Sequence, residues 1–171
     1  EIAAHCTALA DRCSGSDAQK LCNDVLIIAE PYPKHTTAPL ILCCHLLNLL
    51  EPTVRHSVLV LTSDHIIEPI ENFVKDSKIA FLAASDGNLV TFGILPTEPA
   101  TGYGYIQSEA HADKNGAFQI KRFTEKPNVE TAKKYLADGN CYWNSGMFAF
   151  TTDFFIAELA KCTPQIVDAF S

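Results

Sequence analysis

Residues 57–65 read Ser-Val-Leu-Val-Leu-Thr-Ser-Asp-His, an apolar run that ends abruptly in polar side chains. A short continuous apolar run of this kind predicts a strand that is buried on both faces. Residues 67–84 follow with helical spacing, a polar break stands at residues 86–88, and residues 89–95 form the next apolar strand. Strands that alternate with helices predict an α/β fold with a mixed, mostly parallel sheet and helices on both faces.

The chain before this stretch continues the same alternation. Residues 25–29 form another apolar, β-prone run, which leads into Glu30-Pro31-Tyr32-Pro33. The two prolines end the strand and favour an extended loop. Thr36 or Thr37 can then cap a helix that continues to about Leu50.

The chain after this stretch is typical of antiparallel pairing. Residues 103–107 and 117–124 predict two strands, and the polar residues 113–116 between them predict a turn. Asn128 is expected to cap a helix that ends near residue 136. A last strand is predicted over residues 146–151, with helical segments after it. No linker or repeat divides the sequence, so residues 1–171 are expected to form one domain.

Composition limits the classes of molecule that the chain is expected to bind. The chain of 171 residues carries a net charge of -7, which disfavours binding to a nucleic-acid backbone. Its longest nearly apolar stretch, residues 40–50, is shorter than the ~20 residues that span a bilayer. Seven irregularly spaced cysteines predict small buried side chains in a reducing compartment rather than a disulfide framework. We therefore expect a cytoplasmic protein without membrane or nucleic-acid partners. The oligomeric state stays open, a homo-oligomer included.

Ligands of open α/β sheets bind outside the carboxyl ends of the strands. Asp64 stands at such an end and is a candidate ligand of Mg²⁺, which commonly takes one or two protein carboxylates. The alternative is that Asp64 caps the following helix. Lys126 offers a cation to a phosphate, and Glu125 can accept hydrogen bonds from sugar hydroxyls. The alternative for this pair is a surface ion pair at a strand end.

Two further segments are candidates for ligand contact. Residues 101–105 read Thr-Gly-Tyr-Gly-Tyr, in which glycines allow close approach of a backbone to a ligand. The segment lacks a third glycine and a following helix, so it is not a dinucleotide fingerprint, and an ordinary turn is the alternative. Asn144, in Trp-Asn-Ser-Gly-Met-Phe (143–148), can both donate to and accept from sugar hydroxyls.

Four of these segments together, in their order along the chain, resemble the GDP-mannose pyrophosphorylase (mannose-1-phosphate guanylyltransferase) family. Residues 90–106 are very close to the family pattern V-T-F-G-I-x-P-T-x-P-x-T-G-Y-G-Y-I, and residues 123–127 match F-x-E-K-P. Residues 143–148 match W-N-S-G-M-F, and residues 61–66 resemble the family's Asp-His strand tip. Residues 30–39 resemble a divergent copy of a further family motif, E-P-x-x-R-N-T-A-P.

The resemblance implies a Rossmann-like nucleotidyltransferase fold and transfer of GMP from GTP to mannose 1-phosphate, giving GDP-mannose and pyrophosphate. It implies that Asp64 holds Mg²⁺ and that Lys126 holds the sugar phosphate. Glu30 is expected to contact the guanine edge. The mannose is expected to lie against Gly104, Glu125 and Asn144.

The resemblance has two departures. The family's glycine-rich triphosphate loop, which precedes these motifs, does not occur in the sequence, and neither does the family's second metal-binding aspartate, which follows them. The resemblance therefore implies a partial nucleotidyltransferase domain that does not turn over by itself. Two alternatives stay open: a pyrophosphorylase for another nucleotide sugar, and a non-catalytic homologue that binds sugar nucleotides and regulates a partner.

Overall fold

The computed structural model describes residues 26–28 and 36–168 of a chain that divides into two compact units, residues 1–39 and 40–171. In the first unit, residues 26–28 have no regular secondary structure. The strand predicted over residues 25–29 is therefore absent from its described part. The predicted loop at residues 30–33, with Glu30, lies outside the described residues.

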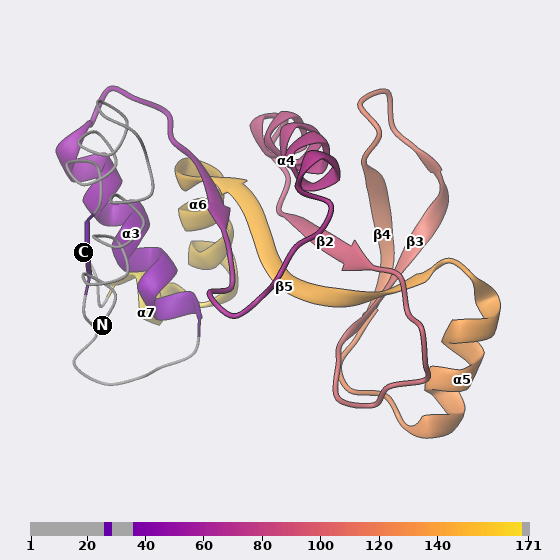
Figure 1. The fold of residues 1–171 in the computed structure, drawn as a ribbon. Coiled ribbons are helices and arrows are strands. Elements are labelled where there is room, and N and C mark those ends of the chain that lie inside the picture. Colours follow the sequence, from indigo (N-terminus) through magenta and orange to yellow (C-terminus); the bar gives the residue numbers. More distant parts are fainter. Residues whose placement is uncertain (1–25, 29–35, 169–171) are drawn as a thin grey trace. The chain divides into compact units, whose positions relative to one another are not determined.

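The first described elements alternate between helices and strands, and a hairpin of two strands follows, as the sequence predicts (Figure 1). In chain order they are α3 (Thr37–Leu50), β1 (Ser57–Val60), α4 (Ile70–Ser85), β2 (Val90–Ile94), β3 (Tyr105–Ala112), β4 (Phe118–Thr124), α5 (Val129–Asp138), β5 (Cys141–Thr151), α6 (Thr152–Cys162) and α7 (Pro164–Asp168).

The sheet corrects the prediction of mostly parallel pairing. In the described part of the chain the strands pair in the order β1-β5-β3-β4. β2 pairs with β5 on the side opposite to β1, and every ladder is antiparallel. Because β1 and β2 both run antiparallel to β5, they point in the same direction, with α4 between them in sequence. The alternation of strands and helices gave this shared direction correctly. It gave no sign that β5, from much later in the chain, lies between the two strands.

Helices cover both faces of the sheet at the end of β5, as predicted. Ala149 of β5 packs against Ala80 and Ala84 of α4. Its neighbour Phe150 stacks on Phe155 of α6, with 4.3 Å between the ring centroids. Neighbouring residues of a strand point to opposite faces, so α4 and α6 lie on opposite sides. Figure 1 shows β5 as a long curved strand that runs from α5 to α6.

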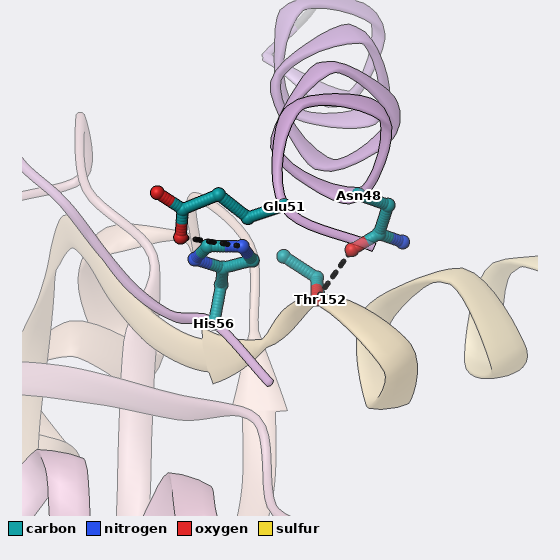
Figure 2. Close-up of polar contacts among 4 residues, drawn as sticks. All are labelled: Asn48, Glu51, His56 and Thr152. Carbon is teal, nitrogen blue, oxygen red and sulfur yellow. Dashed lines mark hydrogen bonds and ion pairs between the residues drawn. The ribbon is translucent and has the colours of Figure 1, made fainter. Parts of the chain in front are cut away.

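Polar contacts join the end of α3 to the starts of β1 and α6 (Figure 2). The Thr152 hydroxyl is fully buried and donates to Asn48 Oδ1 at 3.2 Å. The Thr152 backbone N–H donates to the His56 carbonyl at 3.1 Å, and His56 Nε2 lies 3.8 Å from Glu51 Oε2. Ile41 and Cys44 of α3 are completely buried.

Local signals in the second half of the sequence are confirmed. The Asn128 side chain accepts a hydrogen bond from the Thr131 N–H at 2.9 Å and caps α5. Gly116 has φ +97° in the turn between β3 and β4, where a residue without a Cβ is favoured.

The helix predicted from residue 67 begins instead at Ile70, because the position before Pro69 is disfavoured in a helix.

Two features expected from composition can be compared with the structure. Cys44 and Cys141 are buried, as expected of small apolar side chains, whereas Cys162 is exposed. None of the helices in residues 36–168 has the length and apolar character needed to cross a bilayer.

Candidate functional site

Three of the predicted sugar-binding residues lie together, although they come from three segments of the chain. Gly104 is buried in the loop before β3, and its carbonyl accepts a hydrogen bond from the Asn144 N–H of β5 at 2.8 Å. A Cβ atom placed on Gly104 would lie 2.9 Å from Glu125 Oε2, just past the end of β4. The backbone at Gly104 is therefore in close contact with the Glu125 carboxylate, and glycine is the residue that permits this approach.

The loop that carries Gly104 is held by aromatic side chains. The Tyr105 hydroxyl donates to the Ala100 carbonyl at 2.8 Å and closes the loop. The ring centroids of Tyr103 and Trp143 lie 5.0 Å apart, in a tilted arrangement. Tyr103 remains about half exposed. The loop is thus held against β5 by the hydrogen bond from the Asn144 N–H, which the alternative of an ordinary turn did not include.

Lys126 has an unusual backbone conformation. Its φ is +42°, in the left-handed region that residues other than glycine seldom adopt. Such a conformation costs on the order of 1–3 kcal/mol. Lys126 Nζ lies 3.6 Å from Glu125 Oε1, and both side chains are largely exposed. An exposed ion pair contributes only ~0–1 kcal/mol, so it does not by itself account for the strained backbone.

The surface ion pair that was the alternative for Glu125 and Lys126 is thus present. It also places a cation and a carboxylate side by side next to Gly104. Exposure leaves both groups accessible to a ligand. A sugar phosphate is complementary to both groups, because an ammonium group binds phosphate oxygens and a carboxylate accepts hydrogen bonds from hydroxyls.

Asn144 lies where β5 departs from regular pairing. Thr91 of β2 pairs with Phe148, and Gly93 pairs with Asn144. Three residues of β5, 145–147, therefore lie opposite one residue of β2. Gly146 within this bulge has φ +73°. Bulges are common next to ligand sites, because they redirect a side chain at the edge of regular structure.

Thr91 is a contact of Asn144 that sequence reasoning missed. Its hydroxyl oxygen lies 2.8 Å from Asn144 Oδ1 and 3.0 Å from the Met147 carbonyl oxygen, two acceptors that share its single proton. The available signal was a polar side chain within an otherwise apolar strand. Threonine is so common in strands that this signal alone is weak.

Asp64 lies in an exposed turn after β1. It does not cap α4, because the N-cap position belongs to Pro69, so the alternative role is wrong. Thr62, two residues earlier, lies near the β5 bulge, with its Cγ2 3.7 Å from where a Cβ on Gly146 would be. In the part of the chain that the structure describes, the Asp64 carboxylate makes no hydrogen bond or ion pair. A single exposed carboxylate fits Mg²⁺, which fills its other positions with water and phosphate oxygens.

A cavity of about 470 Å³ lies between α4 and strands β2, β3 and β4. Its walls are mainly apolar and include Phe73, Phe92 and Ile120. Of the predicted site residues that fall within residues 36–168, none lines it. Apolar walls suit neither a phosphate nor a sugar, so the cluster around Gly104 remains the better candidate for ligand binding.

Comparisons with known proteins establish the family of the chain. The family model described as nucleotidyl transferase matches residues 10–171. The chain is 46% identical over 150 residues to a mannose-1-phosphate guanylyltransferase of Salmonella montevideo, covering 85% of this chain and 31% of that protein. It is 50% identical over 112 residues to the xanthan biosynthesis protein XanB of Xanthomonas campestris, covering 66% of this chain and 23% of that protein.

Two solved structures are similar in fold. A crystal structure described as mannose-1-phosphate geranyltransferase from Thermus thermophilus matches with a TM-score of 0.74 and 27% identity, over 89% of this chain and 44% of that one. A mannose-6-phosphate isomerase structure from Helicobacter pylori matches with a TM-score of 0.68 and 33% identity, over 81% of this chain and 50% of that one.

The chain spans less than a third of the length of the curated relatives described above. The family model covers almost the whole of the chain, including every described strand and helix. The chain therefore belongs to the nucleotidyl transferase family.

Proposed function

We propose that the protein is a mannose-1-phosphate guanylyltransferase, which transfers GMP from GTP to mannose 1-phosphate. The observation that carries the proposal is the meeting of Gly104, Glu125, Lys126 and Asn144 in one place. These residues come from separate motifs, and together they offer a cation, a carboxylate and an amide. The names of several relatives, among them the Salmonella protein, support mannose and guanine over other sugars and bases.

The reaction needs no nucleophile from the protein. A phosphate oxygen of mannose 1-phosphate attacks the α-phosphorus of GTP in line, the bond to the β-phosphate oxygen breaks, and pyrophosphate leaves with the electron pair. Catalysis then depends on positioning and on stabilising charge. Mg²⁺ at Asp64 supplies positive charge to the triphosphate when it is bound.

Each residue of the cluster positions a different part of mannose 1-phosphate. Lys126 holds the phosphate of mannose 1-phosphate and directs one of its oxygens toward the α-phosphorus. Glu125 accepts hydrogen bonds from mannose hydroxyls, Asn144 donates to another hydroxyl, and the Gly104 N–H faces the sugar. Glu30, outside the described residues, is proposed to contact the guanine edge.

The proposal is tested with the full-length protein, mannose 1-phosphate and Mg²⁺, by measuring pyrophosphate release with GTP, ATP or dTTP. Formation of GDP-mannose with a clear preference for GTP is expected. Preferred use of ATP or dTTP would instead establish a pyrophosphorylase for another nucleotide sugar. Saturable binding of GDP-mannose without release of pyrophosphate from any of the three would establish a non-catalytic homologue.

A further inference from the structure

The Thr91 hydroxyl of β2 contacts residues at both ends of the β5 bulge. Its oxygen is 2.8 Å from Oδ1 of Asn144, just before the bulge, and 3.0 Å from the carbonyl oxygen of Met147, the last residue of the bulge. Within the bulge, Ser145 Oγ accepts from the Met147 N–H at 3.1 Å. Hydroxyl groups thus take the place of the ladder hydrogen bonds that the bulge interrupts.

We propose that Thr91 is a positioning residue that fixes the side-chain amide of Asn144 for the sugar of the bound sugar nucleotide. The proposal rests on the proposed function, because it deepens the role of Asn144 in the same site. Thr91 acts through Asn144 and does not itself contact the ligand.

The two ends of the Asn144 amide differ in what they can bind. An amide side chain has one acceptor oxygen and one donor nitrogen, and rotation by half a turn exchanges them. In the structure Oδ1 faces the Thr91 hydroxyl, whose single proton is shared between Oδ1 and the Met147 carbonyl oxygen. Nδ2 is then directed away from Thr91 as a donor. Asn144 therefore presents a donor, not an acceptor, to a sugar hydroxyl.

The backbone of Asn144 is fixed independently of its side chain. Its N–H donates to the Gly104 carbonyl at 2.8 Å, which joins β5 to the loop before β3. With the backbone held by Gly104 and the amide held by Thr91, little side-chain freedom remains to be lost when a sugar binds. Fixing a polar side chain in its binding conformation raises affinity by lowering this entropic cost.

The chain contains a matched contact away from the site. Thr152 donates to Asn48 Oδ1 at 3.2 Å, and this contact joins α6 to α3 (Figure 2). Both contacts are Thr–Asn hydrogen bonds between side chains distant in sequence. Thr152→Val therefore removes the same kind of hydrogen bond as Thr91→Val without touching Asn144.

The test is calorimetric titration of the full-length protein with GDP-mannose and, separately, with GTP, alongside thermal unfolding. The variants are Thr91→Val, Thr91→Ser, Asn144→Ala, the double variant Thr91→Val/Asn144→Ala, and Thr152→Val. Thr91→Val is expected to weaken GDP-mannose binding about fivefold to tenfold, the size of one ordinary hydrogen bond. GTP affinity should stay unchanged, because Asn144 is proposed to contact the sugar.

The other variants separate positioning from folding. Thr91→Ser keeps the hydroxyl and should retain the affinity of the unmodified protein. In the Asn144→Ala background, Thr91→Val should have no further effect on GDP-mannose affinity. Thr152→Val should lower the unfolding temperature while leaving that affinity unchanged.

Two results would overturn the role of Thr91. One is an effect of Thr91→Val that is just as large without Asn144. The other is equal loss of GDP-mannose and GTP affinity in Thr91→Val. The proposed function fails in a different way, through lack of GDP-mannose binding by the unmodified protein, and the role of Thr91 would then fail with it.

Discussion

The Glu125 carboxylate lies so close to Gly104 that an added Cβ would stand 2.9 Å from its Oε2 atom. The same Cβ would stand 2.9 Å from Cζ of Phe123. Real Cβ atoms essentially never make contacts this short, so a side chain at residue 104 must displace both neighbours. The position of Glu125 thus depends on the absence of a side chain at Gly104.

Gly104→Ala is therefore expected to weaken GDP-mannose binding by moving the Glu125 carboxylate, with little change in the free energy of unfolding, because both displaced atoms are the far ends of exposed side chains. Gly102→Ala is the matched control, because a Cβ at Gly102 meets no atom within 4 Å. Titration and chemical denaturation of both variants measure the two effects. Equal behaviour of the two alanine variants would show that the Gly104–Glu125 contact has no part in binding.

Comparison of Lys126→Gly with Lys126→Ala is expected to separate the effect of Lys126 on ligand binding from its effect on the stability of the fold. Glycine adopts a φ of +42° readily, so Lys126→Gly should be more stable than Lys126→Ala by ~1 kcal/mol. Both variants lose the ammonium group and should bind mannose 1-phosphate more weakly, by roughly 1.5–3 kcal/mol. Thermal unfolding and calorimetric titration measure the two quantities.

Lys121→Ala is the control for charge, because Lys121 is an exposed lysine of β4, five residues before Lys126. It should bind mannose 1-phosphate as the unmodified protein does. If Lys121→Ala and Lys126→Ala weaken binding equally, Lys126 contributes only to the general charge of the protein.

Asp113 makes the stability of the β3–β4 turn depend on pH. The N–H groups of Ala117 and Asn115 donate to its Oδ1 at 2.9 and 2.8 Å and lower the pKa of the carboxyl below its usual 3.8. A lowered pKa in the folded state means that the ionised group stabilises folding above pH 3.8. This contribution is lost as the pH falls through the lower folded-state pKa.

Asp113→Ala should therefore be less stable than the unmodified protein at pH 7, and the difference should shrink as the pH falls below about 3.8. Asp113→Asn keeps an acceptor oxygen but does not titrate, so it should be less damaging than alanine at pH 7. Its stability relative to Asp113→Ala should not change over the same range. Chemical denaturation at several pH values measures these differences, and a pH-independent gap between Asp113→Ala and the unmodified protein would refute the account.

Asp64→Asn is expected to raise the Mg²⁺ concentration required for half-maximal turnover by about tenfold or more. Loss of even an outer partner of a metal ligand has an effect of this size. Asp86→Asn, which removes a carboxylate after α4, is the control and should leave the Mg²⁺ requirement unchanged. The measurement is the initial rate of pyrophosphate release against Mg²⁺ concentration. An unchanged requirement in Asp64→Asn would remove Asp64 from the proposed metal site.

Features set by local sequence were predictable. The Asn128 cap and the turn at Gly116 follow from the preferences of single residues. The antiparallel hairpin of β3 and β4 follows from the turn between two apolar runs. The position of β5 between β1 and β2 was not predictable, because it is set by pairing between residues about 90 and 60 positions apart in sequence.

The candidate site was likewise predicted in part from the sequence and missed in part. The residue types and their motifs pointed to Gly104, Glu125, Lys126 and Asn144, and the structure brings these four together. The Thr91 contact was missed, because it depends on the bulge in β5 and on the register between β2 and β5. Neither the bulge nor the register can be predicted from the composition of a single strand.

The measurement that tests the central claim most directly is calorimetric titration of GDP-mannose, with Mg²⁺ present, into the full-length protein and its Glu125→Gln variant. Glu109→Gln serves as control, because it removes an exposed carboxylate from the same hairpin. The account predicts saturable binding that is about tenfold weaker or more in Glu125→Gln, as expected for a lost charge-assisted hydrogen bond, and unchanged in Glu109→Gln. Equal affinity in all three proteins, or the absence of binding by the folded unmodified protein, would contradict a sugar-nucleotide site at this cluster.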